Sequence, residues 1–276
     1  MNILIIDELG KLLTAGFYSA KEGLISMIDH ESFTPIDNNI LPSTVNTRVV
    51  SRGPDHILLL DDTDRVWVYG HNNCGQLGLM GVSRLYCFQH ICTLPPIKHI
   101  SVGRYHSLAL DYNGQVWISG YPNHIGKHIY TFSVVGNIPE IQYITAAGQT
   151  SLLISSDGDV LLSDDRKKCR FLNLKRVNYV LTEETTKPII ISGYMGGTWG
   201  NTNIMLIDNN GNVWEKLRSK QLFRQIRKLL PINSLSIGLD NVILLDFEGN
   251  IWVRGRNDYG QLGINSLKSY VKSFTK

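Results

Sequence analysis

The tetrapeptide Gly-Gln-Leu-Gly occurs twice in this chain, at residues 75–78 and 260–263. Each copy stands at the same distance behind a Val-Trp or Ile-Trp pair, which indicates an internal repeat. Four stretches that share the wider pattern align without a gap, and they begin at Thr47, Ile97, Ile141 and Ile232. One further copy opens the chain, and another lies in residues 200–217, where its first apolar run ends at Asp208. A repeat of this kind constrains the whole architecture.

A tight turn recurs once in each copy and sets the length of the unit. Successive turn positions lie 54, 50, 44, 53 and 38 residues apart, at Gly10, Asp64, Gly114, Gly158, Gly211 and Gly249. This spacing is in the range of propeller blades. We place the repeat units at approximately residues 1–44, 45–96, 97–140, 141–188, 189–231 and 232–276.

Each unit has the pattern of a small antiparallel sheet. Residues 106–111 form a mostly apolar run that suits a buried strand, Asn113-Gly114 supplies a turn, and residues 115–119 are rich in strand-forming residues. One such sheet cannot bury both faces, whereas sheets arranged radially bury them against one another. The sequence therefore predicts an all-β fold, a single β-propeller of about six four-stranded blades, or of seven with one incomplete.

Two positions recur in the copies, and we interpret both as structural. A polar side chain stands five residues before the turn Asp, and a small residue that lets strands approach stands three residues earlier. The polar position holds His56, His106, Thr150, Asn203 and Asn241, and the small one holds Gly53, Gly103, Ala147, Gly200 and Gly238. Because the repeats replace His by Asn or Thr, we expect no metal-binding or catalytic role for these histidines.

The tryptophans follow the same repeat. One strand position is shared by Trp67, Trp117, Trp214 and Trp252, which we expect to be buried between blades. Trp199 stands off this register, in the glycine-rich stretch 193–200. We expect that stretch to be a connecting insertion on one rim, because a strand rather than a helix follows it and a phosphate-binding loop needs a helix N-terminus.

Chemistry-bearing motifs are absent from the sequence. It contains no nucleophile elbow, no metalloprotease motif, no P-loop and no spaced metal-ligand cluster. We therefore expect no catalytic residue, no metal and no cofactor. The four cysteines form no CxxC pair, which fits reduced thiols in a cytosol-like compartment. No apolar run reaches about 18 residues, and the first strand carries acidic residues unlike a signal peptide.

Charge is unevenly distributed along the chain. Residues 166–228 hold 13 of the 27 basic residues and 4 acidic ones, which makes 13 − 4 = +9, against 14 − 20 = −6 elsewhere. This basic lobe comprises Arg166, Lys167, Lys168, Arg170, Arg218, Lys220, Arg224, Arg227 and Lys228. It could meet nucleic acid, anionic lipid or an acidic protein surface, or it could be a solvated edge of two degenerate blades.

The repeat resembles a known family. Residues 51–78, with the pattern Ser-x-Gly-x-x-His, an apolar strand, a turn, Val-Trp and Gly-Gln-Leu-Gly, resemble the regulator of chromosome condensation repeat, and residues 141–230 are a degenerate form of it. The founding member of that family has seven blades, exchanges nucleotide on the small GTPase Ran and docks on the nucleosome. Its exchange hairpin and nucleosome-binding tail have no match here, so neither activity transfers by sequence alone.

The resemblance implies a protein-binding propeller that binds a small GTPase of the Ran or Rab type. Exchange activity is the further expectation, with two alternatives: a non-catalytic scaffold, and a chromatin- or DNA-associated propeller that uses the basic lobe. The partner-binding candidates are rim residues and neighbours of the off-register tryptophan: Trp199, Tyr194, Asp29, Glu31 and Asp37. We expect a cytoplasmic or nuclear location. The many Asn and Ile residues hint at an AT-rich genome, and a pathogen could deliver the protein as a host-directed mimic.

Overall fold

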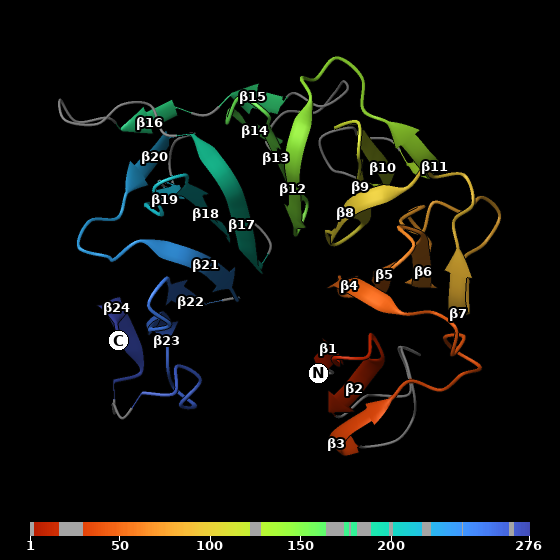
Figure 1. The fold of residues 1–276 in the computed structure, drawn as a ribbon, viewed down its shortest axis with the longest axis horizontal. Coiled ribbons are helices and arrows are strands. Elements are labelled where there is room, and N and C mark those ends of the chain that lie inside the picture. Colours follow the sequence, from red (N-terminus) through yellow and green to blue (C-terminus); the bar gives the residue numbers. More distant parts are fainter. Residues whose placement is uncertain are drawn as a thin grey trace. The chain divides into compact units, whose positions relative to one another are not determined.

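The computed structural model describes residues 3–16, 30–121, 128–163, 174–176, 178–180, 189–198, 201–216, 222–238, 240–264 and 268–276. Throughout these ranges every regular element is a β-strand, and the strands form six sheets (Figure 1). Each sheet is one blade of a β-propeller. The predicted all-β propeller with six blades is confirmed.

The strands follow the chain blade by blade. Blade 1 contains β1 (Ile3–Ile6), β2 (Leu12–Gly16) and β3 (His30–Pro35). Blade 2 contains β4 (Thr47–Arg52), β5 (His56–Asp61), β6 (Val66–His71) and β7 (Arg84–His90). Blade 3 contains β8 (Ile97–Val102), β9 (His106–Asp111), β10 (Val116–Gly120) and β11 (Ile129–Val134).

The second half of the chain is less regular. Blade 4 contains β12 (Ile141–Ala147), β13 (Thr150–Ser155), β14 (Val160–Ser163) and β15 (Leu174–Arg176). Blade 5 contains β16 (Asn178–Val180), β17 (Ile190–Thr198), β18 (Asn201–Asp208), β19 (Val213–Lys216) and β20 (Leu222–Gln225). Blade 6 contains β21 (Ile232–Ile237), β22 (Asn241–Asp246), β23 (Ile251–Arg256) and β24 (Tyr270–Thr275).

Two blades depart from the predicted four strands. Blade 1 has three described strands, because its first strand aligns with the second strand of the other copies. Blade 5 has five, since β16 adds to the outer edge of β20 in parallel, with Tyr179 opposite Phe223. Consecutive strands such as β9 and β10, β5 and β6, or β22 and β23 pair as antiparallel meanders.

The glycine-rich stretch 193–200 is not the rim insertion that the sequence suggested. Its residues up to Thr198 belong to β17, which pairs along its length with β18. A Cβ on Gly193 would lie 2.7 Å from Cδ2 of Leu152, so the missing side chain makes room for the neighbouring sheet. The strand is longer than in other blades because this hairpin extends to Asn201.

The chain divides into two compact units, Met1–Ser151 with Ser163–Asn173, and Leu152–Leu162 with Leu174–Lys276. In the first unit the core lies between blades. Leu58 and Leu60 of blade 2 pack with Ile97 and Ile100 of blade 3. All six residues of β5 are buried, since its alternate side chains face different neighbours.

In the second unit, blades 5 and 6 share a core of their own. Val242 and Leu244 of β22 pack with Met205 and Ile207 of β18. The residues between them, Ile243 and Leu245, are exposed. Strand β22 therefore alternates between buried and exposed positions, as a strand with one covered face does.

Candidate partner-binding surfaces

The hairpin between the second and third strands of a blade is closed by an Asp and a Trp six residues later. In blade 3, Oδ1 of Asp111 accepts from the backbone N–H groups of Asn113 and Gln115, both at 2.9 Å. Its Oδ2 accepts from Nε1 of Trp117 at 3.0 Å. The same bond joins the repeated pairs Asp61–Trp67, Asp208–Trp214 and Asp246–Trp252. We call this arrangement the Asp–Trp clip.

The repeated tryptophans lie in the seams between blades, as expected, but not all are fully buried. Trp214 is 2% exposed, whereas Trp67, Trp117 and Trp252 are partly buried and pack on the core clusters of their seams. Trp214 makes the same clip bond as the other three, so the bond is compatible with either degree of burial. These side chains are structural and leave no tryptophan-lined surface among the described residues.

The repeated histidines are also structural. His56 and His106 are fully buried, and their Nε2 atoms lie 2.9 Å from Oγ of Ser107 and 3.0 Å from Oγ of Ser151 in the following blade. Ser107 donates its own proton to the carbonyl of Gln76, so it accepts from His56, which fixes the Nε2–H tautomer. Burial lowers the pKa of His56 to about 3, so the ring is neutral.

The Gly-Gln-Leu-Gly tetrapeptide builds a rigid loop between β6 and β7. Nδ2 of Asn72 donates to the carbonyls of Leu79 and Val82 at 2.6 and 2.7 Å, and its Oδ1 accepts from the N–H of Leu77 at 2.8 Å. Leu77 is fully buried in the core between blades 2 and 3. In the second copy, Asn257 accepts from Leu262 in the same way.

This first loop presents large side chains to solvent. Met80 is 74% exposed in the loop, and Tyr86 is 70% exposed in β7. The guanidinium carbon of Arg84 lies 4.7 Å from the centre of the Tyr86 ring. Methionine, tyrosine and arginine are the residue types enriched in protein interfaces. We call Met80, Arg84 and Tyr86 the loop patch.

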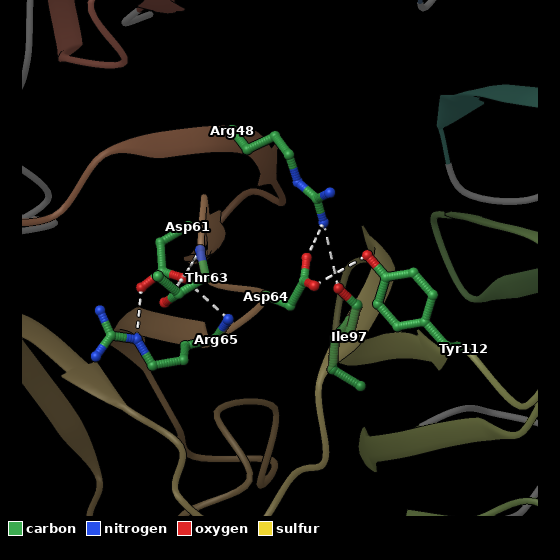
Figure 2. Close-up of polar contacts among 7 residues, drawn as sticks. All are labelled: Arg48, Asp61, Thr63, Asp64, Arg65, Ile97 and Tyr112. Atoms are coloured by element: carbon green, nitrogen blue, oxygen red, sulfur yellow. Dashed lines mark hydrogen bonds and ion pairs between the residues drawn. The ribbon is translucent and has the colours of Figure 1, made fainter.

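A second polar cluster lies at the turn of blade 2, where Asp64 takes the place of the usual glycine (Figure 2). Its Oδ1 accepts from Nη2 of Arg48 at 2.6 Å, and its Oδ2 accepts from the hydroxyl of Tyr112 in blade 3 at 3.0 Å. Arg48 also donates to the carbonyl of Ile97 at 3.3 Å. Asp64 therefore joins blade 2 to blade 3 with a φ of 63°, which a non-glycine residue seldom adopts.

The second unit carries a basic pocket between the outer strands of blades 5 and 6. Its volume is about 640 Å³. Its charged lining residues are Glu215, Arg224, Arg227, Lys228, Arg254 and Lys272. Three of these, Arg224, Arg227 and Lys228, belong to the predicted basic lobe, and the fold adds Arg254 and Lys272 from blade 6 to them.

Two charged residues that depart from the repeat pattern mark this pocket in the sequence, although the overall composition does not. Arg254 occupies a repeat position that holds Tyr69 and Ser119 in earlier copies, and Glu215 occupies one that holds Val68 and Ile118. Arg254 donates to both carboxylate oxygens of Glu215, at 2.5 and 3.3 Å. Two charges that break the repeat pattern thus neutralise each other across the seam.

Most of the other predicted site residues remain predictions. Asp37 is exposed and accepts from the N–H of Asn39 at 2.7 Å in a turn after β3. Glu31 and Tyr194 lie in β3 and β17, and only their backbone is described. The rest lie outside the described residues: Asp29, Trp199, Arg166, Lys167, Lys168, Arg170, Arg218 and Lys220.

Within the described parts of the chain, no group of three or more His, Cys, Asp or Glu residues could hold a metal ion. Cys74, Cys87 and Cys92 are free thiols. A search of the same residues finds no helix long and apolar enough to cross a membrane.

The sequence matches one family in its best-preserved part. The regulator of chromosome condensation (RCC1) repeat matches residues 49–76, 97–124 and 63–110. The X-linked retinitis pigmentosa GTPase regulator of the dog, Canis lupus familiaris, is 26% identical over 154 residues, 51% of this chain and 15% of that protein. The human protein is 27% identical over 142 residues, 48% and 14% respectively, so the chain spans a small part of these relatives.

Solved structures share the fold. Human WBSCR16 matches 100% of this chain and 79% of its own chain with a TM-score of 0.79 and 17% identity. Prp20p from Saccharomyces cerevisiae, studied for its binding to Gsp1p and histones, matches 100% and 74% with a TM-score of 0.76 and 13% identity. The repeat match over residues 49–124 and the six blades agree, and the protein is a six-bladed β-propeller that carries regulator of chromosome condensation repeats.

Proposed function

We propose that this chain is a protein-binding propeller whose partner is a small GTPase. The observation that carries the proposal is the loop patch, in which Met80 of the hydrogen-bonded loop and Tyr86 of β7, with Arg84 over its ring, lie on the surface of the first unit. Exposed side chains on a rigid support form interfaces with little loss of conformational entropy. The distant similarity to a GTPase regulator supports the choice of partner.

Exchange activity is the finer part of the proposal. It requires no acid or base, because a protein that binds the nucleotide-free GTPase more tightly than the loaded form expels the nucleotide by differential affinity. Such a mechanism needs only a binding surface of the kind that the loop patch provides. Trp199, Tyr194, Asp29, Glu31 and Asp37 stay candidate contacts, and a Ran- or Rab-type partner would place the protein in the cytoplasm or nucleus.

The test is a binding and release assay with Ran- and Rab-type GTPases loaded with a fluorescent GDP analogue. We expect binding by the intact chain and faster release of the analogue. A Met80→Ala, Tyr86→Ala double variant should lower affinity at least about tenfold. Tyr259→Ala is the matched control, because Tyr259 is 86% exposed in the equivalent loop of blade 6.

The outcomes separate the alternatives. A GTPase that binds without faster release leaves a scaffold and removes exchange activity. Binding that survives the double variant removes the loop patch as the contact surface. Failure of every Ran- and Rab-type GTPase to bind removes the proposed partner.

A further inference from the structure

The basic pocket of the second unit is built by two blades that meet along their outer strands. Arg224 and Gln225 come from β20, Arg227 and Lys228 from the connection that follows it, and Lys272 and Phe274 from β24. Cross-strand pairing sets Arg224 opposite Glu215 in blade 5. A volume of about 640 Å³ is in the range of pockets that enclose ligands.

The charges in the pocket do not balance. Glu215 is engaged by Arg254, whose guanidinium carbon also lies 4.6 Å from the centre of the Phe274 ring. Four further cations line the cavity, and none has an ion-pair partner in the described part of the chain: Arg224, Arg227, Lys228 and Lys272. All four are exposed, so their charges are available to a ligand.

The remaining wall of the pocket is apolar. Ile226, Leu229 and Phe274 are partly buried and pack on the core that blades 5 and 6 share. They present an apolar surface beside the exposed charged groups. A bare phosphate would use only the charges, whereas a ligand with an apolar side chain would also cover this wall.

The backbone of Lys228, which lines the pocket, has a left-handed conformation. Its φ is 68°, in the left-handed region that is unfavourable for a non-glycine residue. Gly211 and Gly249, the turn residues on either side of it in the sequence, adopt such values without that cost. Asn137 has a φ of 58° at the equivalent place between blades 3 and 4, four residues before the next first strand, so the conformation belongs to this connection and sets where Lys228 stands in the pocket lining.

We propose that this pocket binds an acidic peptide segment that carries an apolar side chain and belongs to a protein partner. Carboxylates of the peptide would pair with the arginines, which accept them in a bidentate geometry, and the apolar side chain would lie on Phe274 and Ile226. The apolar wall favours a peptide over nucleic acid, whose outer surface is a backbone of phosphates. The proposal is independent of GTPase binding.

The probe is a short fluorescein-labelled peptide of Asp and Glu with one central Phe, measured by fluorescence anisotropy at low salt. An Arg227→Glu, Lys272→Glu double variant should weaken binding at least about tenfold. The charge-matched control is Lys11→Glu with Lys98→Glu, two exposed lysines of the first unit, and it should bind within about twofold of the natural chain. Unchanged thermal midpoints show that both variants fold.

Two comparisons test the apolar contact. The same peptide with Ala in place of Phe should bind at least about fivefold more weakly, because it loses the apolar area that Phe would bury against the wall. Duplex DNA and inorganic phosphate serve as competitors. The proposal is overturned by no binding at low salt, by equal loss in both double variants, by equal binding of the two peptides, or by DNA or phosphate displacing the peptide at lower concentration than unlabelled peptide does.

Discussion

Nε1 of Trp117 donates to Oδ2 of Asp111 at 3.0 Å, and the two residues stand six apart in one hairpin. This bond couples the turn of blade 3 to its seam with blade 2, where the indole packs on Leu58 and its neighbours. Trp117 therefore stabilises both the hairpin turn and the packing between the two blades.

Trp117→Ala should lower the free energy of unfolding by about 3 kcal/mol, near the lower end for aromatic truncations because the ring is only partly buried. Trp117→Phe keeps much of the packing but leaves an oxygen of Asp111 without its donor. It should cost about 1 to 2 kcal/mol. Chemical denaturation measures both values. Equal losses for Ala and Phe would mean that the hydrogen bond, not the ring, carries the effect.

The free energy of unfolding should decrease in two separate ranges as the pH falls. Burial lowers the pKa of His56 to about 3 from 6.5, so the unfolded chain takes up a proton as the pH falls below about 6.5 and the folded chain does not. For Asp61, burial raises the pKa, but hydrogen bonds from Trp67, Arg65 and Thr63 outweigh it and hold the pKa at about 2. Its stabilisation is present above about pH 4 and is lost between pH 4 and pH 2.

His56→Asn tests the first range, because copy 6 places Asn241 at the same repeat position. Denaturation measured from pH 7 to pH 4.5 should show a shallower decline for the variant than for the natural chain. Some decline should persist, since burial and the neighbouring Lys98 also lower the pKa of His99. Identical slopes would show that His56 is not buried in its neutral form.

Structural features that recur in every repeat could be predicted from the sequence, whereas features that occur only once in the chain could not. The turn positions, the tryptophan seam and the buried histidines follow from residues that recur in register. The pairing of β16 with β20 could not be predicted, because a three-residue strand in a degenerate repeat has no periodicity of its own. The basic pocket needed the fold, since Arg227 and Lys272 are distant in the sequence and meet only because outer strands of successive blades are neighbours.

Substitutions at Asp64 compare the cost of its positive φ with the stabilisation that its side-chain hydrogen bonds provide. Glycine would remove the cost of the positive φ but would also remove the bonds to Arg48 and Tyr112, which are partly exposed and contribute about 1 kcal/mol or less. Asp64→Gly should therefore change the free energy of unfolding by less than about 1 kcal/mol. Asp64→Asn removes the charge and keeps a residue that tolerates this conformation, and high salt should lessen its effect. A loss of more than about 2 kcal/mol in Asp64→Gly would show that the cluster is a principal link between blades 2 and 3.

The close approach between Gly103 and His106 should make this glycine sensitive to substitution. A Cβ there would lie 2.3 Å from Cε1 of His106 and 3.0 Å from the carbonyl oxygen of Gly148. His106 cannot retreat without losing its contact with Ser151, so Gly103→Ala should lower the free energy of unfolding by about 2 to 3 kcal/mol. Gly136→Ala is the control, because a Cβ at that position meets no atom within 4 Å. A neutral Gly103→Ala would show that the buried histidine moves freely and that its link to the following blade adds little to the stability of the propeller.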